Sequence, residues 1–254
     1  MVDENALVRL LDIVKSSPYP LALLLIFWAD WITSVGPINN WLKYNLTLYS
    51  RYAARPNPIG IIGSIFIYDG IFNIILLTLV TAAFYLVAYY LAAGSHYWIP
   101  QAKVSRLSTI FFASSLAAAI LANVAWYLYP DPETYASYPA YGTSGVVAGA
   151  AGSLTMMILL IIKIKSIANR LTMHGAFSGH RSNPYPAVAA VIGGALWAIT
   201  LVFIFGSFIT REVFTPSGDI VNLWVHYVSF FCGLIIMFIA SANLIFHRIA
   251  MHPV

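Results

Sequence analysis

The sequence is poor in charged residues and in cysteine. Only 9% of its 254 residues are charged, while 60% are apolar. A water-soluble domain of this size needs more charge to cover its surface, so this composition excludes that class. The single cysteine, Cys232, excludes a disulfide within the chain and leaves the redox compartment open. The composition therefore indicates a polytopic membrane protein.

Six long, predominantly apolar stretches separate the groups of charged residues. A helix needs about 20 such residues to cross ~30 Å of hydrocarbon. We therefore predict an all-α membrane protein, with one domain over residues 1–254 and six transmembrane helices. The predicted spans are 19–36, 66–92, 107–128, 144–165, 188–209 and 221–246.

The charges indicate how these spans are oriented. Residues 1–18 carry several charges, and no small-residue cleavage site follows the first apolar run, so we expect no cleavable signal peptide. Six spans put both termini on one side, where nine Lys and Arg residues lie against four on the other. This bias favours termini in the cytoplasm and a place in the cell membrane. The net charge of +4 suits a lipid bilayer, and nothing in the sequence indicates nucleic acid as a partner.

The connecting segments differ in composition. Residues 37–65, on the outer side, mix aromatic and cationic side chains with prolines, a blend typical of the headgroup interface. Residues 166–187, on the inner side, are polar and basic and are predicted as a connector. Asn45-Leu46-Thr47 matches a glycosylation sequon on the outer side. The chain shows no internal repeat and no second domain.

Polar residues within the spans are candidates for function, because they are costly in hydrocarbon. At ~1.5 Å per residue, Asn73, Ser144 and His226 each lie roughly 28–33 Å from the inner end of their own span. Three helices thus present an asparagine, a serine and a histidine at one level near the outer face. Asp69 lies at the start of the second span, and Asp30 near the outer end of the first.

Small residues accompany the serine and the histidine. Gly145 and Gly149 lie four residues apart beside Ser144, and Ser229 and Gly233 lie four apart on the side of His226. This spacing lets two membrane helices approach closely. Close approach favours a Ser–His hydrogen bond, in which the imidazole deprotonates a nucleophilic hydroxyl. An amide side chain and the N–H groups at a glycine-rich helix start are suitable oxyanion donors.

Three motifs resemble those of the rhomboid intramembrane serine proteases, in their six-helix prokaryotic form. They are SIFIYDGIFNIILL at 64–77, GTSGVVAGAAG at 142–152 and HYVSFFCG at 226–233. The family has an Asn in helix 2, Gly-x-Ser-Gly at the start of helix 4, and a His followed by small residues in helix 6. The resemblance covers nearly the whole chain, including the long loop after the first span.

The resemblance implies an intramembrane serine endopeptidase that cleaves transmembrane segments of other membrane proteins near the outer leaflet, without cofactor or metal. It implies Ser144 as the nucleophile, His226 as the general base and then acid, and Asn73 as an oxyanion donor. Gly142 permits the turn that directs the backbone donors. Helix 5, with its glycines, is predicted as a lightly packed gate for the substrate.

One position departs from the family. Where helix 2 usually carries a histidine, four residues before the asparagine, this chain has Asp69. An ionised carboxylate repels an oxyanion, whereas a protonated one donates a hydrogen bond. In a third reading, Asp69 faces solvent or pairs with Arg51 or Arg55. Asp69 is therefore a candidate for tuning or for disabling the site, and the latter gives a pseudoprotease that binds membrane helices without cleaving them.

Other readings of these residues stay open. A small transporter would use Asp30, Asp69 and His226 as ion or proton sites. Serine in a membrane helix often bonds to its own backbone, and an asparagine joins helices by hydrogen bonds. Metal binding is not indicated, because the other histidines are scattered along the inner side without ligand spacing. They are His96, His174, His180, His247 and His252.

Overall fold

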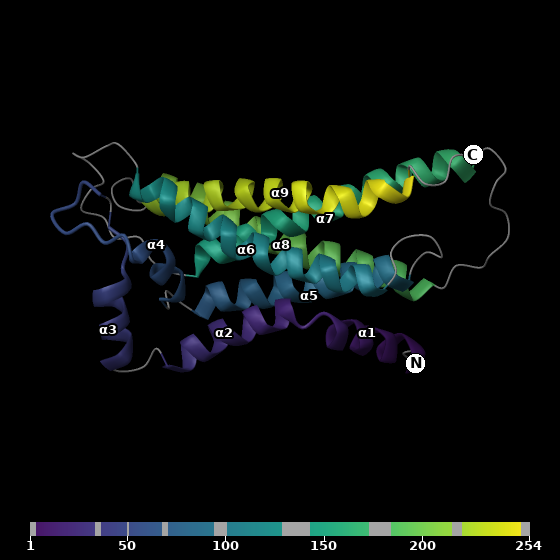
Figure 1. Cartoon of the computed structure of the whole chain (residues 1–254), viewed down its shortest axis with the longest axis horizontal. Helices are drawn as coiled ribbons and strands as arrows, with labels where there is room; N and C mark the ends of the chain where they lie inside the picture. Colours follow the sequence, from purple (N-terminus) through teal and green to yellow (C-terminus); the bar gives the residue numbers. More distant parts are fainter. Residues whose placement is uncertain are drawn as a thin grey trace.

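The regular elements of the protein are all helices (Figure 1). The computed structural model describes residues 4–33, 37–49, 51–67, 71–93, 101–128, 143–172, 184–214 and 220–249. The helices in chain order are α1 (Glu4–Ser16), α2 (Tyr19–Thr33), α3 (Pro37–Leu46), α4 (Gly60–Gly63), the short 3₁₀ helix η1 (Ser64–Phe66), α5 (Ile71–Ala93), α6 (Gln101–Tyr127), α7 (Ser144–Thr172), α8 (Pro184–Phe214) and α9 (Ile220–Ile249).

Several of these helices are long and apolar enough to cross a membrane. Four of them qualify within the described residues, over Ile71–Ala92, Lys103–Tyr127, Ser144–Lys163 and Tyr185–Gly206, and the bent pair α1–α2 makes a fifth span if it is counted as one. The described apolar part of α9 is Val225–Ser241, within a helix of 30 residues. The protein is therefore an all-α, multi-pass integral membrane protein.

Each predicted span falls on a helix, but the bounds differ. The predicted first span, 19–36, corresponds to α2, which ends at Thr33 and is preceded by the separate helix α1. The predicted connector 166–187 is wrong at both ends, because α7 continues to Thr172 and α8 begins at Pro184. A helix satisfies its own backbone hydrogen bonds, so it continues beyond the apolar stretch into polar sequence.

The segment between the first two spans is also more structured than predicted. Helix α3 runs across one end of the bundle, roughly perpendicular to the long helices (Figure 1). Its exposed apolar side chains suit the headgroup interface expected for 37–65. They are Ile38, Trp41 and Tyr44, at 58%, 60% and 77% exposed. We call this end of the bundle the α3 end.

Hydrogen bonds hold the residues after α3 in place. The Asn57 side-chain amide donates to the carbonyl oxygens of Asn45 and Thr47, at 2.8 and 2.9 Å. The Asn45 amide donates to the Trp41 carbonyl at 2.8 Å, and the Thr47 hydroxyl is buried and donates to the Lys43 carbonyl. The sequon is therefore built into the end of a helix and not presented on an exposed loop.

A tyrosine hydroxyl joins the two helices of the bent pair. α1 and α2 meet at an angle of 76°, and in a continuous helix the Leu21 N–H would donate to the Ser17 carbonyl. Instead, the Leu21 N–H donates to the Tyr85 hydroxyl at 3.3 Å, and that hydroxyl donates to the Ser17 carbonyl at 2.7 Å. Insertion of a side chain into the helix ladder is a known cause of a sharp bend. Pro18 and Pro20 add to it, because neither has an N–H to donate.

Replacing Tyr85 by phenylalanine is therefore expected to destabilise the protein. The change removes both hydrogen bonds of the phenol, so the free energy of unfolding should fall by about 1–3 kcal/mol. Tyr90→Phe is the matched control, since Tyr90 lies on the same helix and its hydroxyl makes no hydrogen bond to another described residue. Equilibrium unfolding in mixed micelles measures both; equal stabilities of the two variants would show that the phenol does not hold the bend.

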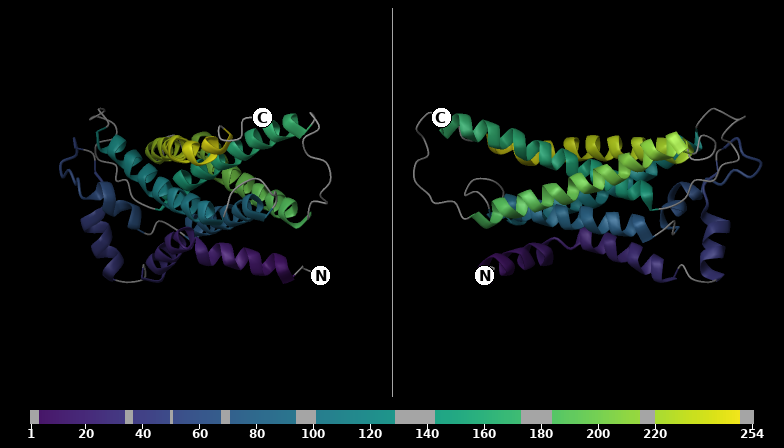
Figure 2. Two further views of the ribbon diagram at one scale, coloured as in Figure 1. Left: turned by 45° about the vertical axis from the view of Figure 1, so that its right-hand side comes forward. Right: turned by 180° about the vertical axis from the view of Figure 1, so that it is seen from behind.

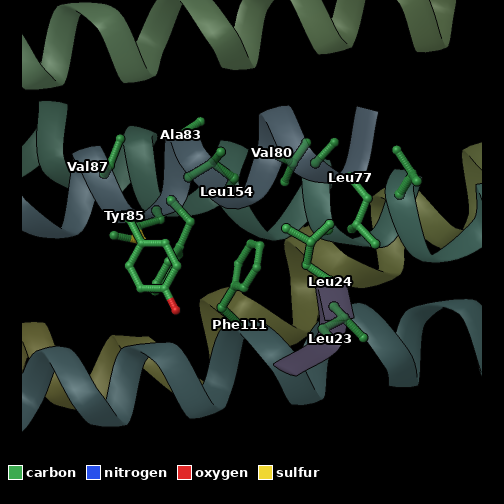
Figure 3. Close-up of a cluster of buried hydrophobic side chains, with 14 of the residues drawn as sticks. Leu23, Leu24, Leu77, Val80, Ala83, Tyr85, Val87, Phe111 and Leu154 are labelled. Atoms are coloured by element: carbon green, nitrogen blue, oxygen red, sulfur yellow. The ribbon is translucent and has the colours of Figure 1, made fainter. Parts of the chain in front are cut away.

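Residues of α2, α5, α6 and α7 meet in the part of the buried core that Figure 3 shows. α2 contributes Leu23 and Leu24, α6 contributes Phe111 and α7 contributes Leu154. α5 contributes the largest share, including Leu77, Val80, Ala83, Tyr85 and Val87. Because α5 contacts both the first span and α7, it forms the centre of this part of the bundle.

The other long helices pack around this centre. α7 contacts α9, α6 and α5, while α8 packs mainly against α5. α2 and α9 lie on opposite sides of the bundle in all three ribbon views (Figures 1 and 2). α8 is the least buried of the four qualifying helices, with 22% of its apolar stretch buried against 67% for α7.

Candidate active site

The site begins with the packing of α7 against α9. The Ser229 hydroxyl of α9 donates to the Gly145 carbonyl oxygen of α7 at 2.6 Å. A methyl group at Gly233 would overlap the Gly149 carbonyl oxygen, and one at Gly152 would overlap the Phe230 carbonyl oxygen. The two backbones are thus in direct contact, which confirms the close approach predicted from the small residues.

These contacts also show how the two helices run. Gly145 lies against Ser229, and Gly149 lies against Gly233, so at these two points α7 and α9 run in the same direction. His226 precedes Ser229 by three residues, or about 4.5 Å along the helix. Ser144 precedes Gly145 directly, so the Cα atoms of Ser144 and His226 differ in level by only about 3 Å.

The orientation of His226 follows from its neighbours on α9. Residues turn by about 100° each around a helix, so His226 lies between Ser229 and Phe230 around the axis. Ser229 contacts α7, and the Phe230 ring packs edge-on against Phe205 of α8, with 5.2 Å between the ring centroids. His226, which is 9% exposed, therefore faces the side of α9 where α7 and α8 meet it.

Ser144 faces the same region from α7. Thr155 lies eleven residues after Ser144, which returns it to within about 20° of the same direction around the helix. The Trp197 indole of α8 donates to the Thr155 hydroxyl at 2.9 Å, so this side of α7 faces α8. Ser144 is half-buried, as expected at the end of such an interface. The predicted serine and histidine thus lie at the same end and on converging sides of α7 and α9.

Asn73 lies at the same end on α5. Its neighbour Phe72 packs edge-on against Phe203 of α8, with 5.4 Å between the centroids. Two residues further on α8, Phe205 contacts Tyr227 of α9 with its centroid 5.7 Å away. Asn73 is half-buried, and its amide makes no hydrogen bond to another residue that the structure describes. Its side chain is thus available as a donor, and its role toward an oxyanion stays a prediction.

Two other predicted site residues, Gly142 and Asp69, lie outside the described residues. Ser64, the first residue of the motif at 64–77, is 1% exposed and accepts a hydrogen bond from the Asn123 amide at 3.0 Å. Ser64 therefore has a structural role. Asp30 is on α2, on the opposite side of the bundle from α9 and His226 (Figures 1 and 2).

The sequence analysis missed two buried polar groups. The Asn123 amide of α6 also donates to the Ile61 carbonyl at 2.9 Å, which ties α4 and η1 to the bundle. In mid-bundle, the hydroxyls of Ser114 and Ser153 lie 2.7 Å apart, and Ser153 donates to the Gly233 carbonyl at 3.2 Å. The rule that selected Asn73, an amide within an apolar span, applies equally to Asn123. For the serines there was no comparable signal, because serine is common in membrane helices.

The fifth predicted span, 188–209, lies on α8. The prediction that its glycines leave this helix lightly packed is only partly right. A methyl group at Gly193 of α8 would come within 3.1 Å of the Leu86 side chain, which is closer than ordinary contact. A methyl group at Gly194 would meet nothing within 4 Å, and one at Gly206 would meet only the Val202 side chain of its own helix, at 4.0 Å. Gly193 thus packs α8 closely against α5, although α8 is the least buried of the four qualifying helices.

Within the described part of the chain, no three His, Cys, Asp or Glu side chains lie close enough together to hold a metal ion. The side chains of the five remaining histidines lie outside that part. The structure places Ser144 and His226 at the same end of two helices in contact, and the chemistry that a hydroxyl and an imidazole offer is proton transfer and nucleophilic attack.

The fold is that of a multi-pass membrane protein in which two parallel helices, α7 and α9, pack through small residues. Polar residues lie at one end of this helix pair. Comparison of the chain with protein-family models, with curated proteins and with solved structures finds no match. The function is therefore argued from the arrangement of residues alone.

Proposed function

We propose that the protein is an intramembrane serine endopeptidase of the rhomboid type, with a Ser144–His226 dyad. The observation that carries the proposal is the hydrogen bond from Ser229 to the Gly145 carbonyl. This bond joins Gly145, which follows Ser144 directly, to Ser229, which lies one helical turn after His226. The proposal requires the two side chains to come within the ~2.6–3.2 Å that proton transfer needs.

The proposed reaction has two steps. The Ser144 oxygen attacks a peptide carbonyl carbon, and its proton passes to His226. His226 then protonates the leaving amine as the C–N bond breaks. A water molecule, deprotonated by His226, next attacks the acyl carbon and releases the new carboxylate, with Ser144 regaining its proton. The Ser144 oxygen is thereby restored for another cycle.

The developing oxyanion is proposed to be stabilised from two sides. Ser144 is the first residue of α7, and the first N–H groups of a helix have no partner within it and lie at its positive end. Asn73 is proposed to add a side-chain N–H from α5, and Gly142 the turn before α7. Such donors are worth about 3–4 kcal/mol each in known oxyanion holes.

The proposed substrate is a transmembrane segment of another membrane protein, cleaved near the outer leaflet. Its peptide bonds are protected by helical hydrogen bonds, so the segment must unwind locally and should contain helix-breaking residues. With termini in the cytoplasm, the dyad lies on the outer side, where water reaches it. The exposed helix α8 is the proposed side of access, because it separates the lipid from Asn73 and His226.

A serine-directed fluorophosphonate probe tests the proposal directly. The wild-type protein in lipid vesicles should be labelled at Ser144, and His226→Ala should reduce the labelling rate by at least about 10²-fold, because the hydroxyl loses its base. Mass spectrometry of the labelled peptide identifies the residue. Labelling that does not depend on His226, or that falls on another serine, would show that the dyad is absent.

A further inference from the structure

Two serines join α7 and α9 by reciprocal hydrogen bonds. Ser229 of α9 donates to the Gly145 carbonyl of α7 at 2.6 Å, and Ser153 of α7 donates to the Gly233 carbonyl of α9 at 3.2 Å. Both serine side chains are fully buried. They are therefore the same kind of contact, made in opposite directions across one interface.

The two bonds differ in their distance from the proposed dyad. Ser229 follows His226 by one helical turn, and its acceptor belongs to the residue next to Ser144. Ser153 lies nine residues beyond Ser144, about 13 Å further along the helix. Its single hydroxyl proton is shared between the Gly233 carbonyl and the Gly149 carbonyl, which lies 2.9 Å away, and its oxygen lies 2.7 Å from the Ser114 hydroxyl of α6. Ser153 thus makes more contacts than Ser229 but lies far from the dyad.

The contact at Ser229 limits how α9 can move against α7. Lipid supplies no hydrophobic force that would select one alignment of two helices, so packing and hydrogen bonds select it. A slip of α9 by one turn would carry His226 about 5.4 Å along the axis, beyond hydrogen-bonding reach of Ser144. The contact of Gly149 with Gly233 limits how closely the two backbones pack, and the bond from Ser229 to Gly145 fixes their alignment one helical turn from His226.

We propose that Ser229 is a positioning residue for His226, holding the imidazole against Ser144 through its bond to the Gly145 carbonyl. The proposal rests on the protease function proposed above and adds a residue to that site. Ser229 does not touch the substrate. Its contribution is the alignment of α9, and its loss should therefore slow the chemical step without weakening substrate binding.

Ser229→Ala and Ser153→Ala form a matched pair to test this. For Ser229→Ala we expect kcat on a labelled transmembrane substrate to fall about 10-fold to 100-fold, with KM unchanged and with a parallel loss in the rate of fluorophosphonate labelling. For Ser153→Ala we expect kcat within about 2-fold of the wild type, since distant sites act independently. Its thermal stability should fall at least as much as that of Ser229→Ala, because the change removes the contacts of the Ser153 hydroxyl with Gly149, Gly233 and Ser114.

The outcomes separate the two proposals. Equal kcat values for Ser229→Ala and Ser153→Ala, each corrected for the folded fraction, would overturn the positioning role, as would a change confined to KM. A wild-type protein that neither cleaves the substrate nor reacts with the probe would instead overturn the protease function. So would a Ser144→Ala variant with full activity. The labelling rate does not depend on the choice of substrate, so it guards against an unsuitable substrate.

Discussion

Ser144→Ala and His226→Ala are each expected to lower the cleavage of a labelled transmembrane substrate by at least about 10³-fold. The first change removes the attacking oxygen and the second removes the group that accepts its proton. Because the two residues act as a unit, the double variant should lose no more than either single variant. The measurement is cleavage by purified protein in vesicles, with the product identified on a gel.

Folding is the natural control for this experiment. The Ser144 hydroxyl makes no hydrogen bond to another described residue, so Ser144→Ala should unfold at the temperature of the wild type. Full cleavage by Ser144→Ala would rule out the serine mechanism. Binding of a substrate helix without cleavage by the wild type would indicate a pseudoprotease, and ion flux that survives Ser144→Ala would indicate a transporter.

Gly152→Ala is expected to reduce the free energy of unfolding by about 1–3 kcal/mol, even though alanine favours a helix. The added methyl group would overlap the Phe230 carbonyl oxygen, which belongs to backbone and cannot move without α9. Since α9 carries His226, the same change should also lower the rate of probe labelling at Ser144. Equilibrium unfolding in mixed micelles, followed by labelling of the folded fraction, measures both effects.

Gly194→Ala is the matched control for the glycine prediction. A methyl group at Gly194 meets nothing within 4 Å, so only the change in helix preference remains. That change should stabilise the protein by up to about 1 kcal/mol. The two glycine variants are thus expected to differ in sign. Destabilisation by both, to the same extent, would show that the α7–α9 contact is not specially close.

The long helices could be located from the sequence, but not where all of them end, and the helices α1, α3 and α4 were not predicted. The apolar runs found the centres of α5 to α9, because apolar composition is what the hydrocarbon selects. The bend at Ser17 could not be found in this way, since it depends on the Tyr85 hydroxyl, 68 residues away. Similarly, the part of α7 beyond residue 165 is polar, so a search for apolar stretches does not predict it as helix.

The candidate site could be predicted in part. The cost of polar groups in lipid selected Ser144, His226 and Asn73, and helical rise placed them at one level. Which way each side chain faces required the structure. The bond from Trp197 to Thr155 shows that Thr155, and with it Ser144, lies on the side of α7 that faces α8. The bond from Ser229 to Gly145 shows that the side of α9 next to His226 faces α7. Asn123, like Asn73, is an amide within an apolar span. Its role in holding α4 and η1 could be assigned only from its hydrogen bonds to Ile61 and Ser64.

The amino-acid sequence by itself determined that this is a multi-pass membrane protein, where its long apolar stretches lie, and how far along each helix the polar residues lie. These properties depend on composition and on a constant rise per residue, which are local. Only the tertiary structure decided that α7 and α9 are in backbone contact, that the first span is bent, and that Ser64 and Asn123 bind each other. These depend on pairs of residues distant in the chain, whose hydrogen bonds and close packing exist only once the helices have come together.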